Sequence, residues 1–82
     1  MSKNSGFANR DRLIELGITI AFARKLRGMS QEQLAEKAGI SRSHLSAIEA
    51  PNLVRAFSVD ILFSIADALN LKASDLLENK IR

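Results

Sequence analysis

Residues that typically begin and end helices recur about every 10–15 positions along this chain. This spacing predicts a fold made of several short helices. Ser30 precedes Gln33 by three positions, which is a capping box that satisfies two free backbone N–H groups at a helix start. Gly39 is typical of a helix end, and Pro51 disfavours helical geometry at the residue before it. Strand signals are weak, because no sustained alternation and no Asn-Gly or Asp-Gly turn is present. The pattern therefore predicts an all-α protein.

Five helices are predicted, at about residues 12–27, 30–39, 41–50, 58–70 and 73–80. Apolar residues at helical spacing are expected to form one core, and they are Leu13, Leu16, Ile20, Ala23, Leu34, Ala35, Ala38, Leu45, Ile48, Val59, Leu62, Ile65, Ala66, Leu69, Leu76 and Leu77. A length of 82 residues suits one domain. We expect a compact domain at residues 12–80 after a flexible N-terminal segment at residues 1–11.

Composition excludes several kinds of chemistry. The chain has no Cys and one His, so a disulfide framework, a zinc site and Ser–His catalysis lack their residues, and no metal or cofactor is expected. Glu32 and Glu36 lie one helical turn apart on a solvated face with no pocket implied, so an enzyme is not expected. Charged residues interrupt every apolar run, and the N-terminus lacks the apolar core of a signal peptide, so we expect a cytoplasmic protein without a membrane span.

Positive charge is concentrated in the first two thirds of the chain. The formal net charge is +3, and residues 1–55 carry nine Lys or Arg against five Asp or Glu. Residues 56–82 carry three against four. This balance is expected if one face meets a polyanion, although small soluble domains are often mildly basic.

A tight connection separates the second and third predicted helices. Only a few residues join them, and such a turn sets two short helices at a large angle, as in a helix-turn-helix. Gly39 would supply the turn, Ile40 would fill the core behind it, and Ala35 would allow the two helices to approach closely.

The stretch Met29–Glu49 resembles the helix-turn-helix of the phage lambda repressor/Cro-type regulators, the XRE family. The resemblance extends upstream to Arg24 and Arg27-Gly28, and downstream to residues 65–69 and 76–77, so that it covers roughly residues 13–78. It implies a compact five-helix, lambda-repressor-like DNA-binding domain with the helix-turn-helix at its second and third helices.

The resemblance also implies which residues meet DNA. Its base-reading positions correspond to Arg42, Ser43, Ser46 and Ala47, which project from the third helix opposite Leu45 and Ile48. Phosphate contacts are expected from Gln31, Lys37, His44 and Arg55. The alternative for Gln31 is an exposed residue that only supports the helix start, and the alternative for His44, on the exposed side of the third helix, is contact with water alone. Arg42 is the strongest candidate, because an arginine near the helix start can give two hydrogen bonds to one guanine, and a phosphate contact is the alternative.

Arg24 and Glu49 match a pair that forms a partly buried ion pair in the family, so Arg24 is expected to be structural. The chain departs from the family pattern at Ala50-Pro51, where a glycine is usual, and in a following loop that is about two residues longer than usual. Lys72 also stands where Ser or Thr usually caps the fifth helix.

Several apolar residues remain after the core is assigned, among them a stripe of Ile14, Ile18 and Phe22 on the first helix. These residues either complete the core or form an interface. One recognition helix reads few base pairs, so we expect a homodimer on a pseudo-palindromic operator, acting as a transcriptional regulator and repressor. The interface candidates are Leu71, Leu76, Leu77, Ile81, Ile18 and Phe22. The alternative is an antitoxin-type interaction protein that neutralises a second small protein.

Overall fold

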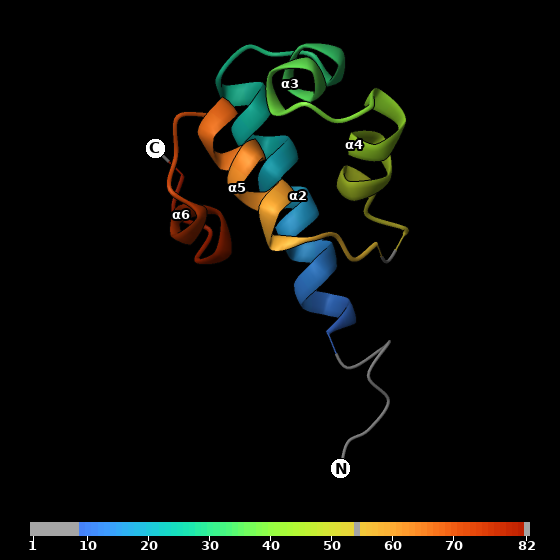
Figure 1. Cartoon of the computed structure of the whole chain (residues 1–82). Helices are drawn as coiled ribbons and strands as arrows, with labels where there is room; N and C mark the ends of the chain where they lie inside the picture. The colour runs from blue at the N-terminus through green and yellow to red at the C-terminus, as the bar shows by residue number, and fades with distance from the viewer. Residues whose placement is uncertain (1–8, 54, 82) are drawn as a thin grey trace.

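The computed structural model describes residues 9–53 and 55–81, and these residues form five helices and no strand (Figure 1). The helices are α2 (Arg10–Leu26), α3 (Gln31–Ala38), α4 (Arg42–Glu49), α5 (Val59–Ala68) and α6 (Ala73–Leu77). Helix α2 runs through the middle of the molecule, with α3 at its C-terminal end at the top, α4 on the right and α6 on the left (Figure 1). The predicted all-α fold is confirmed.

Serine side chains start three of the helices, as predicted. Ser30 Oγ accepts a hydrogen bond from the Gln33 backbone N–H at 3.0 Å, and Gln33 Oε1 accepts from the Ser30 N–H at 2.8 Å. Ser41 and Ser58 cap α4 and α5 in the same manner, at 3.0 and 3.1 Å. Each cap satisfies a backbone donor that has no partner within its own helix, so these local signals fix where the helices begin.

A single apolar core joins the five helices. Its members are Ile20, Ala23, Leu34, Ala35, Ala38, Leu45, Ile48, Leu62, Ile65, Ala66, Leu69 and Leu76. The predicted core positions Val59 and Leu77 were wrong, because they are 62% and 63% exposed. Val59 is the first residue of α5 and faces solvent, and Leu77 lies on the outer side of α6. None of the described helices is both long and apolar enough to cross a membrane.

Two helix boundaries differ from the prediction. Helix α2 begins at Arg10, so residues 10 and 11 are helical, whereas the rest of the predicted flexible segment, residues 1–8, lies outside the described residues. Helix α6 ends at Leu77 because Asn79 adopts a left-handed conformation (φ 58°). At its start, the Lys72 backbone N–H donates to the Asp75 carboxylate at 2.9 Å, so a residue inside the helix replaces part of the missing cap.

Gly17 marks the closest approach of α2 to α4. A side chain at this position would overlap the backbone carbonyl oxygen of Ile48, and its Cβ would lie 3.2 Å from the carbonyl carbon. The obstacle is backbone at the end of α4, which cannot turn aside as a flexible side chain could. Gly17 therefore sets the distance between the long helix and the end of α4.

We expect Gly17→Ala to lower the free energy of unfolding by about 1–3 kcal/mol, the usual cost of overpacking. Helix propensity alone predicts the opposite sign, because alanine is better than glycine in a helix interior by about 1 kcal/mol. Denaturant unfolding of the wild type and the variant measures the difference. A variant that is more stable than the wild type would show that α2 and α4 do not pack this closely.

Candidate nucleic-acid interface

The connection between α3 and α4 has the geometry of a helix-turn-helix. Gly39 is left-handed (φ 75°), and the Ile40 backbone N–H donates to the carbonyl oxygen of Ala35 at 3.0 Å. Ala35 is 2% exposed, so a larger side chain would separate the two helices. Ile40 is half-buried against the core, as predicted. These contacts hold the two helices in one fixed arrangement.

Helix α4 is amphipathic, with its outer face directed to solvent. Leu45 and Ile48 are 0% and 4% exposed and fasten the helix to the core. Of the four predicted base-reading residues, Arg42 and Ser43 are exposed in the first turn, whereas Ser46 and Ala47 are half-buried. The first turn of α4 therefore carries the two most accessible of these four side chains.

The residues predicted to contact phosphates differ in how exposed they are. Lys37 in the last turn of α3 and Arg55 in the loop after α4 are exposed. His44 is half-buried rather than fully on the exposed side, and its backbone N–H is used by the Ser41 cap. Val54 of the same loop lies outside the described residues. The geometry allows contacts from Lys37 and Arg55, and these remain predictions.

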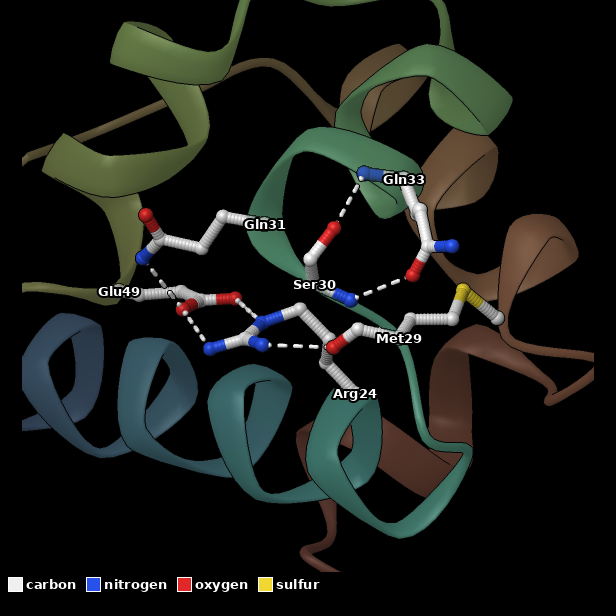
Figure 2. Close-up of polar contacts among 6 residues, drawn as sticks. All are labelled: Arg24, Met29, Ser30, Gln31, Gln33 and Glu49. Atoms are coloured by element: carbon white, nitrogen blue, oxygen red, sulfur yellow. Dashed lines mark hydrogen bonds and ion pairs between the residues drawn. The ribbon is translucent and has the colours of Figure 1, made fainter.

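Arg24 and Glu49 form the ion pair that the family resemblance implies (Figure 2). Arg24 Nε and Nη2 donate to the two Glu49 carboxylate oxygens at 2.9 and 3.0 Å, and Nη1 donates to the Met29 carbonyl oxygen at 2.7 Å. The two side chains are 10% and 4% exposed. This bidentate pair ties α2 to the end of α4 and to the residue before the Ser30 cap.

Gln31 belongs to the same network, and the sequence did not predict this. Its Nε2 donates to Glu49 Oε1 at 2.9 Å (Figure 2). A carboxamide nitrogen carries two hydrogens, so the second one is free to reach a phosphate while Glu49 holds the first. The predicted phosphate role of Gln31 is therefore compatible with the structure, but the side chain is also a structural link between α3 and α4.

Burial separates the predicted interface residues into two groups. Leu76 is 1% exposed and belongs to the core, so the prediction for Leu76 was wrong: it has no surface to offer a second chain. Leu71 and Ile81 are half-buried against the same core. Ile18, Phe22 and Leu77 are 49%, 53% and 63% exposed, so they remain available.

These features define a helix-turn-helix domain, and comparison with known families agrees. Residues 20–76, which make up most of the chain, match the helix-turn-helix family. The chain belongs to this family, and the resemblance to lambda repressor/Cro-type regulators is confirmed.

Two individual relatives match most of this chain. The chain is 38% identical over 65 residues to the HTH-type transcriptional regulator SinR of Bacillus subtilis (strain 168). The aligned region is 79% of this chain and 58% of SinR, so the chain spans little more than half the length of that relative. The SinR of Bacillus licheniformis matches to the same extent.

Solved structures share the fold. The restriction-modification controller protein C.AhdI from Aeromonas hydrophila superposes with a TM-score of 0.75 at 29% identity, over 80% of this chain and 97% of that chain. SinR, described as the master regulator for biofilm formation and solved in complex with DNA, gives a TM-score of 0.70 at 39% identity, over 76% and 97% of the two chains. A SinR–SinI protein complex matches with a TM-score of 0.71 at 38% identity, over 79% and 62%.

Proposed function

We propose that this chain is a sequence-specific double-stranded DNA-binding transcriptional regulator, and that it represses by occupying a pseudo-palindromic operator as a homodimer. The observation that carries the proposal is the rigid α3–turn–α4 unit with Arg42 exposed at the start of α4. A helix of this kind enters the major groove with its N-terminal residues at the base edges. The match to SinR solved with DNA supports the same use of the fold.

Each part of the site has a role in this proposal. Arg42 donates to a guanine, and the hydroxyl of Ser43 reaches a neighbouring base or phosphate. Ser46 and Ala47 offer smaller contacts further along α4. Lys37, Arg55, Gln31 and His44 meet phosphates, which set the position of α4 in the groove and carry no sequence information. The Arg24–Glu49 pair holds α4 in the orientation that these contacts need.

Selection of DNA from a random duplex pool tests the function. The purified protein is expected to enrich a motif with two related half-sites, centred about one helical turn apart or a multiple of it. A pool that shows no motif after repeated rounds would contradict sequence-specific binding.

The affinity for the selected duplex should fall steeply with salt, because Lys and Arg contacts release counterions from phosphates. A dimer that makes about 6–10 phosphate contacts loses about 10³–10⁵ in affinity between roughly 50 and 200 mM salt. Titrations at several salt concentrations measure the slope. A nearly flat dependence would show that the phosphate contacts proposed for Lys37 and Arg55 are absent.

A second candidate function is that of an interaction protein that also binds a small partner protein, as an antitoxin does. The match to SinR in the SinR–SinI complex favours it, together with the exposed apolar residues of α2. Mass measurement of the purified, natively expressed protein distinguishes the two candidates. A mass of two copies of this chain fits the regulator alone, whereas a defined additional subunit fits the second candidate.

A further inference from the structure

The exposed face of α5 is apolar and acidic. Of the ten residues of this helix, the exposed ones are Val59, Asp60, Phe63 and Asp67. Val59 and Phe63 are 62% and 54% exposed, although both side chains are large and apolar. The buried residues of α5 lie on its opposite side and belong to the core. One face of α5 therefore holds the helix in the domain, and the other is presented to solvent.

The two carboxylates form one row along this exposed face. Asp60 and Asp67 are seven positions apart, which is close to two full turns, so they lie at nearly the same angle around α5 and about 10 Å apart along its axis. Val59 and Phe63 are four positions apart and form an apolar row beside them. Neither carboxylate forms an ion pair with another residue in ranges 9–53 and 55–81. Both carboxylates are therefore available to a cationic partner.

This face does not complement itself. Helix α5 contains no Lys or Arg. Two copies that paired through α5, in either direction, would place carboxylates opposite carboxylates or opposite apolar groups, and never opposite a cation. A two-fold interface requires a patch that complements itself, so a second copy of the chain does not fit here. DNA and anionic lipid surfaces carry the same sign of charge as the face and are repelled by it.

We propose that the exposed face of α5 binds a basic amphipathic helix of another protein. Apolar side chains of that helix pack on Val59 and Phe63, and two of its Lys or Arg side chains pair with Asp60 and Asp67. A helix provides this match because its residues at intervals of three, four and seven share one face. Phe63 lies at the middle of the contact and is its aromatic anchor. The inference goes beyond DNA binding and does not depend on it.

The size of the face sets the strength of the complex. A helix of ten residues is about 15 Å long, so a single helix packed on it buries less than the ~1,200 Å² that marks the lower limit of stable interfaces. We therefore expect a weak, reversible complex. Its ion pairs lie at the rim, where they select the partner and are screened by salt.

Binding of a designed peptide tests the charge pattern. The probe is a fluorescently labelled helical peptide of Leu, Ala and Lys, in which two Lys side chains have the spacing of Asp60 and Asp67. Fluorescence anisotropy measures its Kd for the whole chain without DNA. A peptide with Glu in place of Lys should bind about 10-fold more weakly or worse. The chain has a net charge of +3, so non-specific attraction would favour the Glu peptide instead.

Charge reversal locates the binding on α5. Asp60→Lys with Asp67→Lys should weaken the Lys peptide about 10-fold or more and should bind the Glu peptide in its place, because two attractive pairs become repulsive. Glu32→Lys with Glu36→Lys is the matched control. It makes the same change in net charge on α3, whose exposed residues are all polar, and it should leave the Kd nearly unchanged.

Phe63→Ala tests the apolar part of the contact. The variant should bind the Lys peptide about 10-fold more weakly or worse, as is usual when an aromatic anchor is removed from an interface. Its Tm and its mass in solution should remain those of the wild type, because the side chain is exposed. Phe22→Ala removes an aromatic side chain of similar exposure, 53%, from α2 and should bind the peptide as the wild type does.

Four outcomes would overturn the inference. The Lys peptide binds no better than the Glu peptide, the charge reversal on α3 weakens it as much as the reversal on α5, or Phe63→Ala binds it as tightly as the wild type. The fourth is a change in the mass of Phe63→Ala in solution, which would show that a second copy covers the face. None of these measurements contains DNA, so they decide the role of α5 whether or not the chain selects a DNA motif.

Discussion

Arg24→Ala is expected to lower the free energy of unfolding by about 3–5 kcal/mol, the usual cost of removing one partner of a buried ion pair. The substitution leaves the Glu49 carboxylate buried, with Gln31 as its remaining side-chain donor among residues 9–53 and 55–81, and it frees the Met29 carbonyl oxygen. For a domain of this size each kcal/mol corresponds to roughly 4–8 °C, so the Tm should fall by at least about 12 °C. Thermal and denaturant unfolding measure both quantities.

Arg10→Ala is the matched control, because Arg10 lies on the same helix and, within the described part of the chain, forms an exposed ion pair with Asp11 at 3.7 Å. Its Tm should change little, since surface ion pairs contribute little to stability. The Tm of Arg24→Lys should lie between those of the two alanine variants, because lysine keeps the charge but cannot make the two-donor contact. If Arg24→Ala keeps full stability and yet abolishes DNA binding, then Arg24 is a DNA contact and the structural assignment is wrong.

Local sequence signals were sufficient for most of the fold. The Ser30–Gln33 box and the Ser41 cap act over three residues, and Gly39 acts through its own backbone, so each could be recognised without knowledge of the tertiary structure. The Arg24–Glu49 pair joins residues 25 positions apart, and only the family resemblance implied it.

The errors arose where a local pattern does not fix orientation. Leu76 and Leu77 are adjacent in a helix of five residues, too short for periodicity to show which one turns inward. Val59 has helical spacing to the core positions of α5, but it is the first residue of that helix and is 62% exposed, so none of the described helices covers it.

Of two further structural features, one could have been predicted from the sequence and the other could not. A glycine inside a predicted helix costs about 1 kcal/mol relative to alanine, and Gly17 was therefore a signal of close backbone approach that the pattern contained. The Gln31–Glu49 hydrogen bond had no such signal, because it depends on how α3 and α4 lie relative to each other.

Arg42→Ala should weaken binding to the selected DNA far more than binding to random DNA. Arg42 stands in the first turn of α4, directly after the Ser41 cap, and its side chain is exposed. Two hydrogen bonds to one guanine discriminate by ~1–3 kcal/mol per base pair, or about 5–150-fold, and a dimer has two such positions. The variant should keep nearly the wild-type Tm and salt slope.

Arg55→Ala is the comparison variant, because its exposed side chain is proposed to meet a phosphate. It should weaken all sequences to a similar extent and reduce the salt slope by about one for each phosphate that the shortened side chain no longer reaches. Together the two variants separate base reading from positioning on the backbone.

A competition assay tests whether α4 reads bases through Arg42. Wild type and Arg42→Ala are each bound to the selected duplex and competed with duplexes substituted at every position. The wild type should discriminate at one guanine in each half-site, and Arg42→Ala should lose that preference while keeping the others. If Arg42→Ala weakens the selected and random duplexes equally and keeps every preference, Arg42 contacts a phosphate and does not read the sequence.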